Sequence, residues 1–301
     1  MLSRGYKRES SGYVLADETS TSVDIGDEAC QIKCKFPRVI VAVDANRRRG
    51  MRHLLAMPED VRPQVVLLDD GFQHRYVQPS FSILITDYGR LFYEDKLLPV
   101  GRLREPAKSA SRANMVVISK CPENMDSVQC GEISDCVNHR FAVEYIHFTQ
   151  ILYQQPEHVF PLECPPCKPE NIRKEDDILL VTGIANPAPL VAEIKKYSDN
   201  VRVITFADHH AFKKNDIQKM QTELAAMKND KPLIFCTEKD AARIRHNPYF
   251  PDEWKSRMYY IPIQTHVWRD TNKLKDTLIA HISSMNKSSN VLQQSICNEQ
   301  K

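Results

Sequence analysis

The stretch Val65-Val-Leu-Leu-Asp69-Asp70-Gly71-Phe72-Gln73-His74 decides the fold class that we predict. Four apolar residues typical of a buried strand end abruptly in two carboxylates and a turn glycine. In open α/β sheets ligands bind outside the carboxyl ends of the strands, which places Asp69 and Asp70 at a candidate site. An aspartate there commonly holds Mg²⁺, because this hard cation prefers oxygen ligands and keeps several waters. A pair of turn or helix-capping aspartates is the alternative.

Short apolar runs of strand length recur along the chain, with helix-like or polar segments between them. This alternation predicts an α/β fold in which mostly parallel sheets are covered by helices. A first set, which we expect to form one buried sheet, comprises residues 39–43, 65–68, 81–85 and 115–118. A second set comprises residues 178–181, 201–204, 233–235 and 259–261, with helices expected over 216–227 and 272–285.

The sequence changes character between Asn138 and Lys174, where prolines cluster. The aromatic-rich stretch 141–153 at this junction is typical of paired extended strands that bridge two bodies. We therefore predict four parts: an incomplete core domain over 1–138, an extended two-strand linker over 139–176, a smaller α/β domain over 177–286 and a flexible tail over 287–301.

The composition is that of a globular protein: 42% of the 301 residues are apolar and 27% are charged. A net charge of +2 is too small for indiscriminate binding to nucleic acid or to an anionic membrane. Nine scattered cysteines without a secretory signal indicate reduced thiols in a cytosol. The close pair Cys164 and Cys167 lacks the further ligands of a zinc site, and no apolar run is long enough to span a bilayer.

The strand that ends in Asp69 and Asp70 has a Walker B arrangement, whose usual partner is the phosphate-binding motif G-x-x-x-x-G-K-[ST]. That motif does not occur in these 301 residues. The nine glycines stand at positions 5, 12, 26, 50, 71, 89, 101, 131 and 183, and lysine follows none of them. Backbone amides and a lysine that would cradle nucleotide phosphates are therefore not found in this sequence.

Seven short motifs occur in the order seen in tetraacyldisaccharide 4'-kinases, so the chain resembles this family of lipid A 4'-kinases. The motifs are Ser3-Arg-Gly-Tyr6, Ile25-Gly-Asp-Glu28, Asp69-Asp-Gly-Phe-Gln-His74, Leu98-Pro-Val-Gly-Arg-Leu-Arg-Glu-Pro106, Gly183-Ile-Ala-Asn-Pro187, Phe206-Ala-Asp-His-His210 and Thr237-Glu-Lys-Asp240. The resemblance implies a P-loop NTPase-like, mostly parallel sheet with a second, smaller α/β domain. Members of the family begin with a membrane-associating helix, a strand and a P-loop, and only then reach the segment that resembles Ser3–Tyr6. We expect the missing strand to leave apolar surface bare and the chain to aggregate.

The resemblance also assigns roles to single residues. Asp27 matches the catalytic base that accepts the proton of the sugar 4'-hydroxyl, and His209 matches the histidine that pairs with this base, with His210 as the weaker alternative. Asp69 and Asp70 match the Mg²⁺-binding acids. A further set matches or suits positions that line the site or bind phosphate: Arg47, Gln73, His74 and Arg104. Thr237–Asp240 is interpreted as a capped turn between a strand and a helix, without a catalytic role.

The function implied by the resemblance is ATP-dependent phosphorylation of the 4'-hydroxyl of tetraacyldisaccharide 1-phosphate, with Mg²⁺ as cofactor. A monomer at the cytoplasmic face of the inner membrane of a Gram-negative bacterium, without a nucleic-acid partner, is expected. Little activity is expected from these 301 residues, because charge on the β- and γ-phosphates would go largely unmatched. Two alternatives remain: a non-catalytic lipid-binding protein, and another Mg²⁺-dependent phosphotransferase or phosphohydrolase that uses Asp69 and Asp70.

Overall fold

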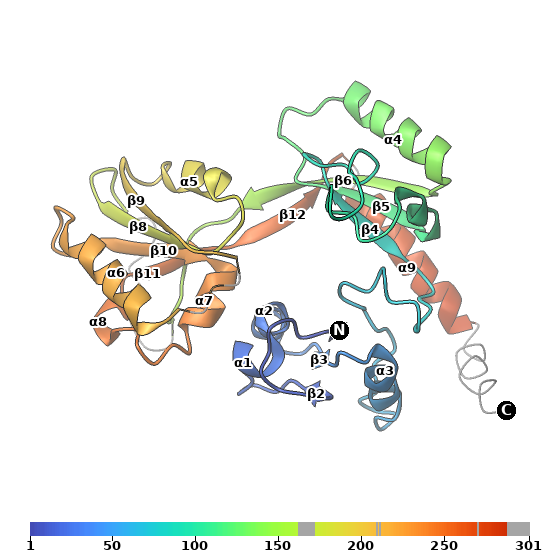
Figure 1. The fold of residues 1–301 in the computed structure, drawn as a ribbon, viewed down its shortest axis with the longest axis horizontal. Coiled ribbons are helices and arrows are strands. Elements are labelled where there is room, and N and C mark those ends of the chain that lie inside the picture. The colour runs from blue at the N-terminus through green and yellow to red at the C-terminus, as the bar shows by residue number, and fades with distance from the viewer. Residues whose placement is uncertain (162–171, 209, 211, 270, 288–301) are drawn as a thin grey trace. The chain divides into compact units, whose positions relative to one another are not determined.

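The computed structural model describes residues 1–161, 172–208, 210, 212–269 and 271–287, and it is a mixed α/β protein with parallel sheets (Figure 1). Contacts divide the chain into two compact units. Unit 1 comprises Met1–Asp70 and Tyr153–Gln264, and unit 2 comprises Gly71–Leu152 and Thr265–Lys301. The chain passes between them three times. The predicted domain boundaries at 138 and 176 do not coincide with these passages, and that division stays a prediction.

The second set of predicted strands forms one sheet in unit 1, as expected. Its order is β7-β11-β10-β8-β9, in which β8 (Asp177–Thr182), β9 (Asn200–Thr205), β10 (Leu233–Thr237) and β11 (Met258–Ile261) are parallel and β7 (Glu157–His158) is antiparallel. The helices that accompany it are α5 (Ala188–Ile194), α6 (Lys214–Ala225), α7 (Glu238–Ile244) and α8 (Asp252–Lys255).

Alternate residues of β8 face two different apolar clusters, which explains why this strand reads as a continuous apolar run. Leu179 and Val181 pack in the cluster that contains Trp254, whereas Ile178 and Leu180 pack in the cluster that contains Tyr259. All six residues of β8 are buried. A parallel strand that is covered on both faces is buried along its whole length, so its sequence is a nearly continuous apolar run.

Residues 1–70 form a small three-stranded sheet of order β1-β3-β2, with β1 (Leu2–Ser3), β2 (Val14–Leu15) and β3 (Ala42–Val43). Strand β1 runs parallel to β3, and Leu2 forms a parallel bridge with Leu68 on its other side. The bridge consists of hydrogen bonds from Leu2 N to Leu67 O (2.8 Å) and from Asp69 N to Leu2 O (3.1 Å). The helices of this part are α1 (Ser22–Ile25), α2 (Asp27–Lys35) and α3 (Arg47–Leu55).

Unit 2 is built on a four-stranded sheet of order β12-β6-β5-β4, with β4 (Ile83–Asp87), β5 (Met115–Ser119), β6 (Tyr145–Tyr153) and β12 (Ile263–Val267). Strands β4, β5 and β6 are parallel. Its helices are η1 (Ala107–Arg112), α4 (Ser127–Phe141) and α9 (Thr271–Lys287). Strands β6 and β12 are neighbours in this sheet, and each lies at a passage of the chain between the units: β6 ends at one passage and β12 begins at another. The predicted linker likewise has two extended strands, but β12 lies far from residues 141–153 in the sequence.

The prediction that the first set of apolar runs forms one buried sheet is wrong. Strand β3 belongs to the three-stranded sheet of unit 1, whereas β4 and β5 belong to the four-stranded sheet of unit 2. Residues 65–68 form only the bridge to Leu2 instead of a strand, and Leu67 remains 68% exposed. A short segment with a hydrogen-bonded neighbour on one side behaves as a sheet edge, so its apolar composition alone did not ensure burial.

Several sequence features lie outside the described residues: the Cys164 and Cys167 pair, the prolines at 165, 166 and 169, and the predicted tail from residue 288 on. Among the residues that are described, no helix combines the length and the apolar character needed to cross a membrane.

Candidate functional site

Parallel strands bring three chain segments to one edge of the small sheet in unit 1. Strand β1 is followed by Arg4, β3 by Asp44, and the bridged segment 67–68 by Asp69 and Asp70. The turn at Asp70 has φ +45°, a left-handed conformation that aspartate tolerates better than most residues. Asp44 is fully buried and accepts two hydrogen bonds from Arg49, at 2.8 and 2.9 Å. Asp69 and Asp70 thus stand at the carboxyl edge that the sequence predicted for them.

Arg47 connects two of these strand ends. Its guanidinium is buried and donates to the carbonyl of Asp44 at 2.8 Å and to the carbonyl of Asp69 at 3.1 Å. Burial lowers the pKa of Arg47, although the charges of Asp69 and Asp70 act in the opposite direction. Two N–H groups of Arg47 are occupied by backbone carbonyls, so the residue holds the Asp69–Asp70 turn and leaves fewer donors for a phosphate.

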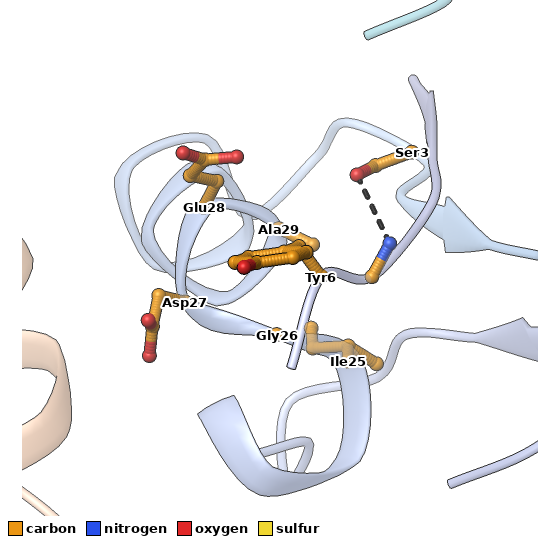
Figure 2. A pocket seen from close by; sticks show the side chains of 8 residues that line it. Ser3, Tyr6, Ile25, Gly26, Asp27, Glu28 and Ala29 are labelled. Atoms are coloured by element: carbon orange, nitrogen blue, oxygen red, sulfur yellow. Dashed lines mark hydrogen bonds between the residues drawn. The ribbon is translucent and has the colours of Figure 1, made fainter. Parts of the chain in front are cut away.

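Asp27 is the first residue of α2 and follows a glycine with unusual backbone geometry. Gly26 has φ 86° and ψ 158°, a region that only glycine enters readily. A Cβ at this position would lie 3.0 Å from Tyr6 O and 3.2 Å from Gly5 C. Figure 2 shows this close approach: the Ser3–Tyr6 loop and the start of α2 line one small pocket, from which the Asp27 side chain points away.

An arginine from a distant part of unit 1 pairs with Asp27. Arg243 Nη2 lies 2.5 Å from Asp27 Oδ2, and Arg243 Nη1 lies 3.0 Å from Asp240 Oδ1. Burial acts to lower the pKa of Arg243, but the hydrogen bond and charge of Asp27 and the charge of Asp240 outweigh it and raise the pKa. Arg243 therefore stabilises the ionised form of the Asp27 carboxylate.

The position of Arg243 is fixed by Asp240, which is completely buried. Asp240 accepts hydrogen bonds from Gly183 N (3.0 Å) and from the Thr237 hydroxyl (2.7 Å). Thr237 is the N-cap of α7, and its Oγ1 accepts a hydrogen bond from the backbone N–H of Asp240 (3.0 Å). Gly183 follows β8 and Thr237 ends β10. Strands β8 and β10 are neighbours in the sheet. The chain continues from β8 to β9 on one side and then crosses to β10 on the other side, so a topological switch point lies between β8 and β10. Open α/β sheets bind ligands at such switch points.

The segment predicted to supply the partner of Asp27 also reaches this edge of the sheet. His209 lies outside the described residues, but its neighbour Asp208 forms an ion pair with Lys239 of α7 at 3.1 Å. Asp208 also raises the pKa of Arg243 through its charge. His210 contacts another group: its Nε2 lies 2.8 Å from Asp216 Oδ2, and its ring stacks on Phe206.

The remaining predicted site residues belong to unit 2, where two motif loops meet. Glu105 accepts a hydrogen bond from Arg112 at 2.7 Å, and Arg112 also lies over the Phe72 ring, 4.8 Å from its centroid. Gln73 and Arg104 are exposed, and the His74 ring packs edge-on against Tyr76. These contacts bring the loop that carries Gln73 and His74 together with the loop that carries Arg104.

Sequence reasoning missed Arg243, Asp240 and Glu105. A usable signal existed for the first two: an acid and an arginine three residues apart on a predicted helix face the same side of it. Thr237–Asp240 was interpreted only as a capped turn, which is correct for the local structure. The sequence spacing does not indicate, however, that Arg243 pairs with Asp27, because the two residues are 216 positions apart.

Gly26 offers a direct test of this geometry. We expect Gly26→Ala to lower the free energy of unfolding by about 2 kcal/mol, because alanine would be strained at this φ and would crowd the Gly5–Tyr6 backbone. The matched control is Gly131→Ala in the middle of α4, where an added Cβ meets nothing within 4 Å. That change should stabilise the chain by about 0.5–1 kcal/mol. Urea unfolding of both variants gives the comparison, and equal effects would show that Gly26 is not constrained.

Three comparisons with known proteins are informative. Residues 1–283 match the family model for tetraacyldisaccharide-1-P 4'-kinase. The tetraacyldisaccharide 4'-kinase of Parabacteroides distasonis is 46% identical over 97% of this chain and 79% of that protein, and the one of Bacteroides thetaiotaomicron is 41% identical over 96% and 77%. The crystal structure of LpxK from Aquifex aeolicus, an "apo" form in complex with ATP, matches with a TM-score of 0.65 at 22% identity, covering 93% of this chain and 78% of that one.

Proposed function

The chain belongs to the tetraacyldisaccharide-1-phosphate 4'-kinase family, and from this membership we infer that it transfers the γ-phosphoryl group of ATP to the 4'-hydroxyl of tetraacyldisaccharide 1-phosphate. The product is lipid IVA, an intermediate of lipid A biosynthesis. The match to the family model over residues 1–283 is the observation that carries this conclusion. ATP is the co-substrate, in keeping with the ATP complex of the structurally similar kinase.

Asp27 is proposed as the general base. Its carboxylate pairs with Arg243 and stands at the first residue of α2, where the helix dipole also favours a negative charge. As the 4'-oxygen forms its bond to the γ-phosphorus, Asp27 accepts the hydroxyl proton, the bond from that phosphorus to the β–γ bridging oxygen breaks, and ADP leaves. His209, next to Asp208 in the sequence, is proposed to pair with Asp27 during the proton transfer.

Asp69 and Asp70 are proposed to hold Mg²⁺. Two adjacent carboxylates after the bridged segment at Leu68 would leave most of the octahedral positions to water and substrate phosphates, which is how this ion is usually held. Bound there, Mg²⁺ would neutralise charge on the β- and γ-phosphates. Arg47 fixes the turn through the Asp69 carbonyl. Three residues of unit 2 are proposed to contact phosphate groups of the substrates: Gln73, His74 and Arg104.

The substrate carries four acyl chains, so we propose that the reaction takes place at the cytoplasmic surface of the inner membrane, with the protein bound peripherally. A monomer is sufficient for this chemistry, because the residues assigned roles above all come from one chain.

Phosphate transfer from [γ-³²P]ATP to tetraacyldisaccharide 1-phosphate in detergent micelles tests the proposal. These 301 residues contain no G-x-x-x-x-G-K-[ST] motif, so the rate should be low and the assay should use single-turnover conditions with enzyme in excess. Label should appear on the 4'-position and should not appear on a 4'-deoxy disaccharide. Binding of the lipid without any label transfer would instead favour a non-catalytic lipid-binding protein.

A further inference from the structure

Residues 95–103 of unit 2 form a loop with an apolar tip, here called the 95–103 loop. Leu97, Leu98 and Val100 are 44%, 61% and 78% exposed, and Pro99 between them is exposed as well. Single apolar side chains on a protein surface are normal and need no explanation. Four of them in succession on one loop form a patch, and exposed apolar patches with a polar rim usually mark binding surfaces.

Both ends of the 95–103 loop are anchored in the core of unit 2. Leu91 and Phe92, which precede the loop, are buried in the apolar cluster that contains Val116. Leu103, which ends the loop, packs against the same cluster. The exposed tip therefore projects from a well-packed base, and its exposure does not result from a poorly packed segment.

Backbone hydrogen bonds close the 95–103 loop on itself. Leu103 N donates to Lys96 O at 3.0 Å, and Leu98 N donates to Leu103 O at 3.0 Å. Gly101 N donates to Leu97 O at 3.0 Å and so closes the turn at the tip. These bonds bring the two ends of the loop together, as in the compact surface loops that frequently carry function.

Asp95 holds the base of the loop in one conformation. Its Oδ1 accepts hydrogen bonds from Lys96 N (2.8 Å) and Arg102 N (3.3 Å), and its Oδ2 pairs with Arg90 Nε at 3.3 Å. Gly101 passes so close to this base that an added Cβ would lie 2.1 Å from Lys96 O. A loop constrained in this way presents its apolar side chains ready for contact, so little conformational entropy is lost when they bind.

Cations outnumber acids around the apolar tip. Residues 90–112 carry six arginine and lysine side chains but only three acidic ones. Two of the three acids, Asp95 and Glu105, are engaged in ion pairs with arginines. Lys96 and Arg102 stand on either side of the tip, and both are exposed. An apolar tip with cations at its rim is complementary to an anionic bilayer, whose charged headgroups lie above an apolar interior.

We propose that the tip of the 95–103 loop is a membrane-binding element that inserts into the surface of a bilayer containing anionic phospholipids. Residues 97–100 enter the boundary between headgroups and acyl chains, while Lys96 and Arg102 stay at the level of the lipid phosphates. The loop would thus provide the peripheral attachment proposed above, and only the identity of the membrane rests on the proposed function. Vesicles that contain no substrate test the loop independently of catalysis.

Flotation of the 301-residue chain with phospholipid vesicles is the first experiment. Vesicle-bound protein rises in a density gradient, whereas aggregated protein stays at the bottom. We expect the chain to rise with phosphatidylcholine vesicles that contain about 30% phosphatidylglycerol, and much less with phosphatidylcholine alone. Joint replacement of Lys96 and Arg102 by alanine should weaken binding to the anionic vesicles about 10–30-fold, because two cations near the anionic surface are lost. Failure of the unaltered chain to rise would overturn the proposal.

The apolar contribution is tested by the double variant Leu98→Asp, Val100→Asp. It should weaken binding to the anionic vesicles at least about 10-fold, because two carboxylates replace the inserted apolar side chains. Val128→Asp is the matched control: Val128 is also apolar, 67% exposed and in unit 2, and it stands in the first turn of α4, where aspartate is tolerated. This control should bind as the unaltered chain does. Unchanged flotation of the double variant, or an equal loss in Val128→Asp, would refute the proposal.

A second measurement does not depend on whether the aspartate variants fold. Val100→Trp keeps an apolar side chain at the tip, and its emission should be quenched by vesicles whose lipids carry bromine in the upper part of the acyl chains. Val128→Trp should show no more quenching than the unaltered chain, in which Trp254 and Trp268 provide the background. Equal quenching of both variants would refute insertion. If Val100→Trp responds only to tetraacyldisaccharide 1-phosphate in micelles, or only to protein concentration, the substrate or a second copy covers the loop and the proposal is wrong.

Discussion

Replacing Asp27 by asparagine is expected to lower the single-turnover rate of phosphate transfer to tetraacyldisaccharide 1-phosphate by about 10²–10⁴-fold, the usual contribution of a positioned general base. Asparagine has nearly the same size as aspartate but cannot accept the hydroxyl proton. The affinity for the lipid should change little, because Asp27 acts on the proton and not on the acyl chains. The measurement is label transfer from [γ-³²P]ATP, together with lipid binding by the same variant.

Glu28→Gln provides a matched control, because Glu28 is the next residue of the same helix and is also a carboxylate near its N-terminus. It is exposed and should change the rate by no more than a few-fold. If both variants lose activity equally, the helix dipole or the fold of the Gly26 loop is responsible. If Asp27→Asn retains its rate within about three-fold, Asp27 is not the base.

The five-stranded sheet of unit 1 could be predicted from the sequence because three of its strands, β8, β10 and β11, are buried almost completely. Residues 178–181, 233–235 and 259–261 are continuous apolar runs, and all of them became strands of one parallel sheet. Residues 65–68 have the same composition, but Leu67 remained exposed because the segment found a partner on one side only. Apolar composition predicts a strand only where the rest of the fold supplies neighbours, and a sequence does not state which neighbours are present.

The proposed site could be derived from the sequence to the extent that its chemistry is local. Asp69 and Asp70 could be proposed because an apolar run that ends in two carboxylates is visible within ten residues. Asp27 was proposed through the resemblance of its motif. Arg243 was not found, because its partner is 216 residues away and only the packing of α2 on α7 brings the two together. Tertiary ion pairs of this kind have no sequence period, so their discovery requires coordinates.

Replacing Asp240 by alanine is expected to lower the free energy of unfolding of unit 1 by about 3–5 kcal/mol, the usual cost of breaking a buried ion pair by removing one partner. Asp240 is completely buried and accepts from Gly183 N, from the Thr237 hydroxyl and from Arg243. Alanine would leave all three donors without this acceptor. Urea unfolding followed by the fluorescence of Trp254, in a Trp268→Phe background, reports on the core of unit 1.

Asp208→Ala is the matched control, because Asp208 also pairs with a cation of the same region but is an exposed carboxylate. Its ion pair with Lys239 should contribute about 0–1 kcal/mol, as exposed ion pairs do. Asp240→Asn should fall between the two, since the amide oxygen can still accept from Gly183 N while the charge facing Arg243 is lost. If Asp240→Ala costs less than about 1 kcal/mol, Arg243 is held by Asp27 and its other neighbours. Asp240 would then not be needed to position Arg243 next to the proposed base, Asp27.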